Sequence, residues 1–206
     1  MFPMGKDLVF VGGGHAHLTS LKNLSHFRKL GHQVTLVSPS PYHYYSGMGP
    51  GMLSGIYHPW EVRFHVKKLA EERGAVFIKG KAIRVDPLQH LLFLDSGEKV
   101  HYDVVSFNTG SEVPVETLTQ APVDPLFPVK PVINLLKARQ AILEAIRDDK
   151  KLHLVVVGGG PAGIEISTNL LRLLHENRGK GEITLIGGKR LLGDAPGKVR
   201  RLAMES

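Results

Sequence analysis

Three glycines follow a short apolar run in LVVVGGGPAGIEISTN, residues 154–169. The apolar run predicts a buried strand over 154–157, since helices cover both faces of a parallel sheet. Gly158 lets the chain turn sharply at the strand end, and Gly160 removes a Cβ so that backbone N–H groups can approach a pyrophosphate. Gly163 allows the following helix to pack closely on the strand. This spacing predicts a dinucleotide-binding turn.

The helix after this turn is expected to begin at Pro161, whose missing N–H would have no helical partner there. Its first turn, with Ala162, presents unpaired N–H groups and the positive end of the helix dipole to a phosphate. Glu165 lies one turn further along.

A second copy of the pattern strengthens this interpretation. Residues 8–24, LVFVGGGHAHLTSLKNL, align without a gap with residues 154–170. Each copy is followed, after a helix-length interval, by another apolar strand, QVTLVS at 33–38 and EITLIG at 182–187. Two βαβ units of one design predict two dinucleotide half-sites. The alternative is one real site and a chance run of glycines.

The first copy replaces the third glycine by His17. A bulky side chain there would hold helix and strand slightly apart, or point its imidazole along the phosphates of a cofactor. Alternatively, His15 and His17 are simply polar residues at a helix start. Because residues two apart do not share a helix face, we predict no metal site from this pair.

Composition narrows the function classes. The 206 residues suit one or two domains, and the absence of cysteine excludes a disulfide framework, a thiolate metal site and a dithiol redox centre. There is no run of about 18 apolar residues and no signal-peptide pattern at the start, so a cytoplasmic location is expected. The net charge of +7 favours anionic partners such as dinucleotides or acidic headgroups. Without clustering or a nucleic-acid motif, it does not indicate a nucleic-acid partner.

The remaining pattern predicts the order of elements. Ser38 ends the second strand, at the place where many such folds hold a ribose hydroxyl with an acid. Residues 40–59 are too rich in Tyr, Gly and Pro for a regular element, and predict either a loop that approaches a flat ligand or a plain surface loop. Further expected elements are a strand at 7–11, helices over 15–30, 61–72 and 131–147, strands at 75–78 and 103–108, and an antiparallel meander at 83–85, 91–94 and 99–102.

These elements predict an α/β fold with Rossmann-like, doubly wound parallel sheets and a small antiparallel meander. The expected domains are an FAD-binding domain over 1–112, a proline-rich connector and helix over 113–150, and an incomplete NAD(P)-binding domain over 151–206. The chain is expected to be the N-terminal part of a longer protein, or a truncated gene product.

In its paired glycine turns, YDVVSFNTGS and FPVK, the chain resembles the two-dinucleotide flavoproteins called pyridine nucleotide-disulfide oxidoreductases. Within them it looks most like the type II NADH dehydrogenase branch, including the dehydrogenase-like module sometimes fused to selenide, water dikinase. The resemblance implies an enzyme with FAD and NAD(P)H as cofactors, and a quinone or similar small molecule as electron acceptor. It also implies contact with the inner face of a membrane through a C-terminal part, and is compatible with a homodimer.

The resemblance also implies residue roles. On the FAD side, it places Gly12, Gly14 and His15 at the pyrophosphate, Ser38 near the ribose, Ala82 at the adenine, Tyr45, Ser46 and Gly47 at the isoalloxazine, and Thr109 and Gly110 over the cofactor. On the NAD(P)H side, it places Gly158, Gly160, Pro161 and Ala162 at the pyrophosphate, with Gly163 behind them. Glu165 would be the catalytic carboxylate near nicotinamide and flavin; the alternative is an acid that only complements the helix dipole.

Two departures limit this comparison. Gly187 stands where an acid would select NAD, and Lys189 and Arg190 behind it could accept a 2′-phosphate or form a solvated turn. The later Gly-Asp motif that holds the flavin is missing, because no apolar strand immediately precedes Gly193-Asp194. A non-catalytic dinucleotide-binding module is therefore the alternative to an oxidoreductase, and a single-cofactor Rossmann dehydrogenase is a third reading.

Overall fold

The computed structural model describes residues 5–115 and 125–205, and the chain divides into two compact units. The first unit contains residues 1–44 and 63–111, and the second contains residues 45–62 and 112–206. The division of the chain into domains over 1–112, 113–150 and 151–206 stays a prediction. Part of the expected connector, residues 116–124, lies outside the described residues.

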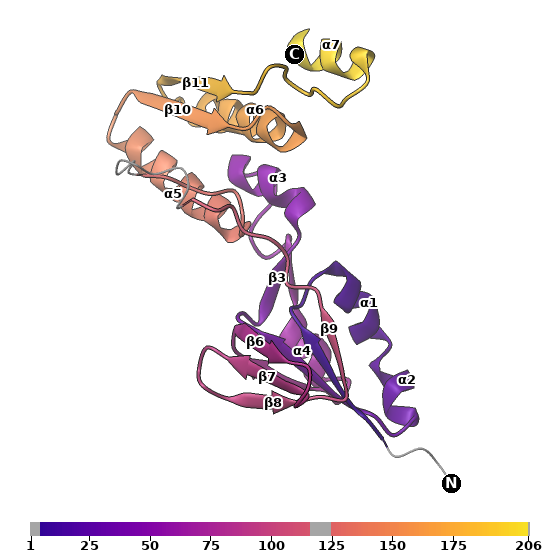
Figure 1. Cartoon of the computed structure of the whole chain (residues 1–206). Coiled ribbons are helices and arrows are strands. Elements are labelled where there is room, and N and C mark those ends of the chain that lie inside the picture. Colours follow the sequence, from indigo (N-terminus) through magenta and orange to yellow (C-terminus); the bar gives the residue numbers. More distant parts are fainter. Residues whose placement is uncertain (1–4, 116–124, 206) are drawn as a thin grey trace. The chain divides into compact units, whose positions relative to one another are not determined.

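A four-stranded parallel sheet forms the centre of the first unit (Figure 1). Its strands, in spatial order, are β5 (Val76–Lys79), β2 (Gln33–Ser38), β1 (Asp7–Val11) and β9 (Val104–Phe107). The chain runs from β1 outward through β2 to β5 and then returns to the opposite side of β1 with β9. The strand order therefore reverses at β1.

Each face of this sheet has its own cover. Phe10 and Leu36 on one face pack against helices, whereas Val9, Val11 and Val37 on the other face pack against Leu92 of an antiparallel meander. The helices are α1 (His15–Lys22), α2 (Leu24–Lys29) and α4 (Val66–Glu71). The meander contains β6 (Ala82–Asp86), β7 (Leu91–Leu94) and β8 (Lys99–His101), which confirms the meander expected from the sequence.

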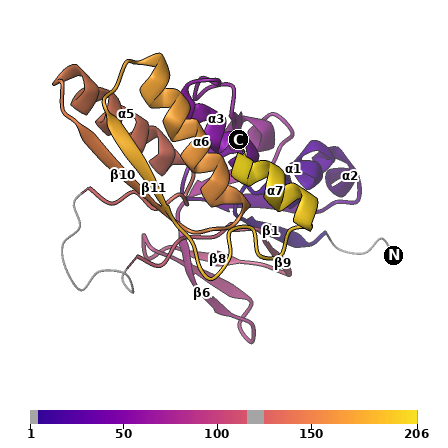
Figure 2. The ribbon, with the colours of Figure 1, turned by 90° about the horizontal axis from the view of Figure 1, so that it is seen from above.

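The second unit packs helices on a two-stranded parallel sheet (Figure 2). The strands are β10 (Leu152–Val157) and β11 (Gly181–Ile186). The helices are the single 3-10 turn η1 (Ser46–Met48), α3 (Gly49–Ser54), α5 (Ile133–Arg147), α6 (Pro161–Glu176) and α7 (Gly197–Glu205). α3 packs against both α5 and α6, and α6 packs on both strands.

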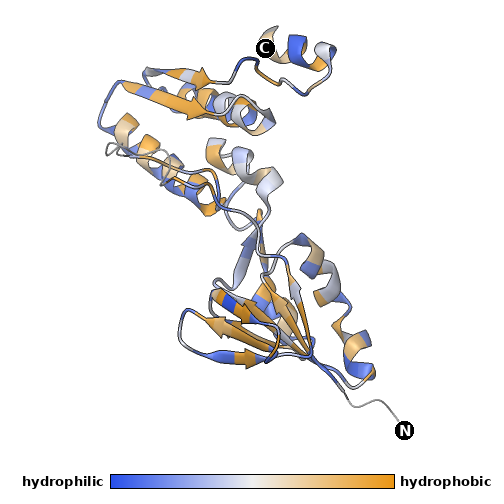
Figure 3. Cartoon of the chain, in the orientation of Figure 1, coloured by the Kyte–Doolittle hydropathy of each residue, from blue (hydrophilic) through white to orange (hydrophobic). Residues whose placement is uncertain are grey.

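One face of the β10–β11 sheet is open in the described chain, so the prediction that both faces of the second apolar strand are covered is wrong there. Val155 and Val157 are 50% and 70% exposed, although Val156 between them is buried. Figure 3 shows both strands coloured as predominantly hydrophobic. Alternation of side chains along a strand places alternate residues on opposite faces, and α6 reaches only one of them.

The helix expected over 15–30 is broken in two at Asn23. The Asn23 backbone N–H donates to Ser20 O (3.0 Å), three residues back, and its side-chain amide donates to Thr19 O (2.9 Å). Side chains that bond nearby backbone groups in this way compete with the continuing helix. α2 then ends before Gly31, whose φ of +83° confirms the expected glycine stop.

The expectation of an irregular loop over 40–59 is also wrong. The segment contains β3 (Tyr42–Tyr44), η1 and α3, and β3 pairs with β4 (Arg63–His65), where a helix was predicted. The glycines serve close packing: a Cβ at Gly51 would meet the Tyr57 ring at 2.6 Å, and one at Gly49 would meet Val132 at 3.0 Å. Among the described residues, no helix combines the length and apolar character needed to cross a bilayer.

Candidate dinucleotide-binding sites

The first candidate site lies at the carboxyl edge of the parallel sheet, where β1, β2 and β9 all end. Ligands of doubly wound sheets bind outside this edge, at the point where the strand order reverses. In the first unit, that point is between β1 and β9. The predicted site residues that the structure brings to this edge are Gly12, Gly14, His15, Ser38, Thr109 and Gly110.

The glycine turn after β1 approaches the end of β9 closely. Gly12 has a φ of +87°, and its N–H donates to Val37 O (2.8 Å). A Cβ at Gly12 would overlap the Asn108 carbonyl, and a Cβ at Gly14 would overlap Asn108 Oδ1. The structure therefore requires both glycines because of Asn108.

Asn108 is a site residue that the sequence reasoning missed. Its Oδ1 accepts the Ala16 N–H (3.1 Å) and its carbonyl accepts the Gly14 N–H (3.3 Å). Two of the N–H groups near the start of α1 are thus taken from across the turn, while the N–H donors of the Asn108 amide take no part in these bonds. An amide directly after an apolar strand, in FNTG, was the signal that could have identified it.

His17 points into the protein rather than along a phosphate. Its side chain is 3% exposed, stacks on Phe10 (4.9 Å between centroids), and places Nδ1 2.6 Å from Gly12 O and Nε2 2.9 Å from Ser106 Oγ. A carbonyl only accepts, so Nδ1 carries a proton and donates to Gly12 O, while Nε2 and the Ser106 hydroxyl form a second hydrogen bond. His17 therefore ties β1, the glycine turn and β9 together.

Ser38 and Ala82 follow one another along the same edge. Ser38 is buried, and its hydroxyl donates to Ser40 O (3.0 Å), which leaves the oxygen lone pairs for an incoming hydroxyl. The carbonyl of Ser38 accepts the Gly80 N–H (3.1 Å), and the chain then enters β6 at Ala82.

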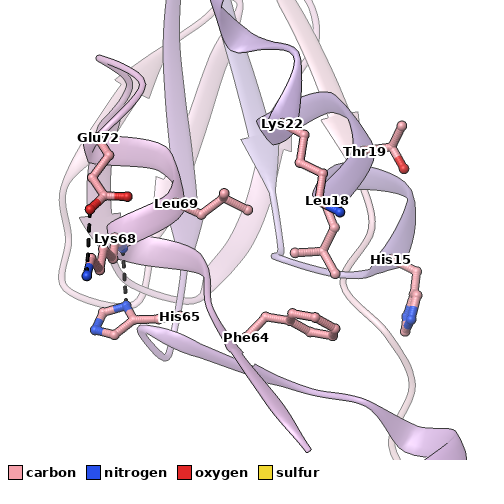
Figure 4. Close-up of a pocket in the computed structure, with 9 residues that line it drawn as sticks. All are labelled: His15, Leu18, Thr19, Lys22, Phe64, His65, Lys68, Leu69 and Glu72. Carbon is pink, nitrogen blue, oxygen red and sulfur yellow. Dashed lines mark hydrogen bonds and ion pairs between the residues drawn. The ribbon is translucent and has the colours of Figure 1, made fainter.

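A hollow of about 400 Å³ lies between α1 and α4, and His15, the residue after the glycine turn, is part of its lining (Figure 4). Lys22 and Lys68 lie on its rim over an apolar floor that includes Leu18 and Leu69, and Lys68 is paired with Glu72 at 3.7 Å. Its other lining residues are His15, Thr19, Phe64 and His65.

His15 also contacts His43, with ring centroids 5.4 Å apart. Burial of His43, and secondarily the charge of His15, hold the pKa of His43 below its ordinary value. The Nε2 atom of His43 is buried and has no hydrogen-bond partner in the structure, which accords with a ring that resists protonation.

The second candidate site is the glycine turn between β10 and α6. Gly158 has a φ of +130°, and its N–H donates to Ile186 O (2.8 Å). A Cβ at Gly160 would meet nothing within 4 Å, so the turn is open where a pyrophosphate would approach. A Cβ at Gly163 would overlap the Gly158 carbonyl, which confirms that Gly163 permits close packing of helix on strand.

α6 begins at Pro161, as predicted, with Gly160 as its N-cap. Pro161, Ala162 and Glu165 are exposed on its first turns. The backbone carbonyl of Glu165 accepts the side-chain amide of Asn169 (2.8 Å), and this bond leaves the Glu165 carboxylate unengaged.

The predicted flavin-contacting residues Tyr45, Ser46 and Gly47 belong to the second unit. They form η1 and its entrance, and the Tyr45 ring lies over Gly47, where a Cβ would meet Cζ at 3.0 Å. The following α3 is tied to its neighbours by Ser54 Oγ, which donates to Asn169 Oδ1 (2.6 Å), and by Arg139, which donates to Leu53 O (2.9 Å). α6 therefore holds both the glycine turn and this segment.

The described residues contain no group of three or more His, Cys, Asp or Glu side chains that could hold a metal ion. What they do contain is two parallel-sheet units, each with a strand that ends in a glycine turn and enters a helix. That arrangement defines the class of Rossmann-like α/β proteins that bind two dinucleotides.

Comparison with known proteins specifies the family. Residues 6–205 match the family described as pyridine nucleotide-disulphide oxidoreductase, and the chain belongs to it. This confirms the fold class and the superfamily expected from the sequence.

Curated relatives include ferroptosis suppressor protein 1 of Taeniopygia guttata, 33% identical over 124 residues, covering 59% of this chain and 29% of that protein. External alternative NAD(P)H-ubiquinone oxidoreductase B2 of Arabidopsis thaliana is 23% identical over 208 residues, covering 87% of this chain and 35% of that protein. The chain thus spans about a third of the length of these relatives.

Solved structures show the same fold. NDH2 from Plasmodium falciparum in complex with NADH superposes with a TM-score of 0.80 at 21% identity, covering 97% of this chain and 45% of that one. The sulfide:quinone oxidoreductase of Aquifex aeolicus superposes with a TM-score of 0.72 at 22% identity, covering 98% and 48%.

Proposed function

We propose that the first unit binds FAD, that the second binds NAD(P)H, and that the protein is an oxidoreductase that passes a hydride from NAD(P)H to the flavin and electrons on to a quinone. One observation carries the proposal: two glycine turns of one design, each at the carboxyl edge of a parallel sheet and each followed by a helix. Family membership supports it.

In the first unit, the proposed roles follow the sheet edge. FAD fits there because the left-handed Gly12 turns the chain away from the edge and the exposed start of α1 faces outward from it. Gly12, Gly14 and His15 would hold the pyrophosphate, Ser38 the ribose, and Ala82 the adenine. Thr109 and Gly110 would cover the cofactor, and the isoalloxazine contact of Tyr45, Ser46 and Gly47, which belong to the second unit, stays a prediction.

In the second unit, the open side of Gly160 fits the pyrophosphate of NAD(P)H. Gly158, Gly160, Pro161 and Ala162 would bind it, with Gly163 keeping α6 close to β10. Glu165 would orient the nicotinamide and act as the catalytic carboxylate. Bound flavin supplies the hydride acceptor, and the protein supplies position and the exclusion of water.

The proposed acceptor is a quinone, because one relative is named an NAD(P)H-ubiquinone oxidoreductase and another a sulfide:quinone oxidoreductase. A quinone dissolved in a bilayer would be met by peripheral contact with a membrane surface. The chain has no cysteine, so a cysteine-based disulfide or sulfide reaction within these residues is excluded.

The test is reconstitution of the purified chain with FAD, followed by anaerobic titration with NADH and NADPH. We expect a yellow protein whose flavin absorbance bleaches on addition of the reduced nucleotide and returns with a soluble quinone. The Gly14→Val variant, whose side chain would overlap Asn108, should lose the flavin. A colourless protein that binds ADP-ribose without turnover would instead identify a non-catalytic nucleotide-binding module.

A further inference from the structure

The chain leaves β11 at Gly187, directly beside the second glycine turn. A Cβ at Gly187 would meet Leu191 Cδ2 at 2.6 Å and the Cα of Gly159 at 3.3 Å. A side chain at this position would displace the Leu191 side chain and press against the Gly159 backbone. The position at which an acid would hold the ribose 2′-OH of NAD is therefore a glycine packed beside the turn, and it supplies no carboxylate.

The residues that follow fold back onto the glycine turn. The Leu192 N–H donates to the Gly159 carbonyl (2.7 Å), Leu192 is 6% exposed, and the Leu191 side chain contacts Gly159. Lys189 and Arg190 lie between Gly187 and this anchor, and both are exposed. A freely solvated turn would not need such an anchor, whereas this one holds the backbone that carries Lys189 and Arg190 next to the glycine turn.

The charge of this region favours a further anion. Residues 187–204 contain five basic side chains and one acid, Asp194. Asp194 is exposed and forms no ion pair with Lys189 or Arg190, and the described residues provide neither cation with another acidic partner. Two unpaired cations on a turn anchored beside a phosphate site are suited to a second phosphate.

We propose that the second unit selects NADPH over NADH, with Arg190 and Lys189 binding the adenosine 2′-phosphate. The inference rests on the proposed function of this unit as the NAD(P)H site. Arginine can bind a phosphate through two parallel N–H donors, and lysine adds a compact charge. Arg190 is accordingly the main determinant and Lys189 the weaker one.

The experiment is calorimetric titration of the purified chain with 2′,5′-ADP and with 5′-ADP, which differ only in the 2′-phosphate. We expect the wild type to bind 2′,5′-ADP about 10-fold more tightly or better, as a charge-assisted bond to phosphate allows. Arg190→Ala should remove most of this preference, and Lys189→Ala part of it, with 5′-ADP affinity changed less than about twofold. Lys151→Ala is the matched control, because it removes the same charge at the opposite, amino end of β10.

Equal binding of both ligands, or a preference that survives in the Arg190→Ala variant, would overturn the NADPH assignment while leaving the nucleotide site in place. Failure of both ligands to bind the folded chain would overturn the proposed function of the second unit as well. A preference lost equally in Lys151→Ala would show that general charge, rather than the anchored turn, attracts the 2′-phosphate, and would also contradict the assignment.

Discussion

The two glycine turns share one sequence pattern but are supported in different ways. In the second unit, Gly163 packs against the Gly158 carbonyl and the space beside Gly160 is open. In the first unit, His17 occupies the position of Gly163 and reaches the equivalent carbonyl, that of Gly12, through a hydrogen bond. Asn108 fills the space beside Gly14, the equivalent of Gly160.

The difference teaches that the third position of the fingerprint has one physical task that two residues can perform. The helix approaches the carbonyl of the first glycine either with a Cα that has no side chain or with a side chain that hydrogen-bonds to that carbonyl. His17 makes this hydrogen bond, and the same ring also binds Ser106 of β9. The first turn is therefore braced by its neighbours, and the second by close backbone contact.

The strongest way to break the second turn is Gly163→Ala. Its Cβ would overlap the Gly158 carbonyl, so α6 must move off β10, and we expect a loss of about 3 kcal/mol or more in the free energy of unfolding. Urea unfolding followed by circular dichroism and by Trp60 measures it. Trp60 is the one tryptophan of the chain and lies in the second unit.

Gly160→Ala is the matched control, because its Cβ meets nothing and its φ of −85° suits alanine. Its stability should stay within about 0.5 kcal/mol of the wild type. Its affinity for ADP should nevertheless fall, since the methyl group stands where the pyrophosphate approaches. Equal unfolding of the two variants would contradict the different tasks assigned to the two glycines.

The corresponding break in the first turn is His17→Ala. It removes two hydrogen bonds, leaves the Gly12 carbonyl without its donor in a buried place, and opens space beside Phe10. We expect a loss of about 2–3 kcal/mol in urea unfolding. His17→Gln, which can still donate to Gly12 O, should recover part of that loss. A wild-type midpoint in His17→Ala would refute the bridging role.

Much of the fold could be predicted because it depends on local patterns. The strands at 7–11, 33–38 and 91–94 and the helix start at Pro161 follow from apolar runs and proline at the first helical position. The α3 helix could not be predicted in this way. Its glycines are disfavoured in isolation, and only packing against Tyr57, Val132 and Leu135 explains them.

Asn23 and Asn169 also show that local sequence does not decide where a helix ends. They occupy equivalent positions in the two copies, and each donates its side-chain amide to the carbonyl four residues earlier. The helix ends at Asn23 but continues through Asn169, whose Oδ1 is held by Ser54. The same local bond therefore accompanies two different outcomes, and Asn169 has in addition the tertiary contact with Ser54.

Asn108→Ala makes the first turn resemble the second. It removes the acceptor of the Ala16 N–H and clears the space beside Gly14. Loss of a side chain that caps a helix start costs about 1 kcal/mol, which urea unfolding can measure. If the amide also donates to a bound phosphate, FAD affinity should fall beyond this structural effect.

Asn108→Asp keeps the Ala16 contact but adds a negative charge, so it should retain stability and lose FAD. An Asn108→Asp variant that binds FAD normally would exclude Asn108 from the phosphate site.

Only those site residues whose spacing in the sequence forms a known pattern could be predicted. The glycines could be predicted from their spacing. The roles of Asn108 and His17 depend on contacts between the first glycine turn and the end of β9, which are about ninety residues apart along the chain. Which face His17 presents depends on the strand that the chain brings beside β1, and the sequence pattern left its imidazole free to point either way.

The smallest effect concerns the first helical residue, His15 in one copy and Pro161 in the other. His15 contacts His43, whose pKa is lowered first by burial and then by the charge of His15. The folded state therefore takes up this proton at lower pH than the unfolded chain, whose histidine has a pKa near 6.5. The contribution of His43 to stability is full above that pH and is lost as the pH falls from there through the folded pKa.

NMR titration of the His43 ring should show a midpoint below 6.5, and His15→Gln should raise it. Because burial remains in that variant, the midpoint should not return fully to the unfolded value. An unchanged midpoint in His15→Gln would show that the charge of His15 does not lower the pKa of His43. The starts of α1 and α6 would then not differ electrostatically through His15.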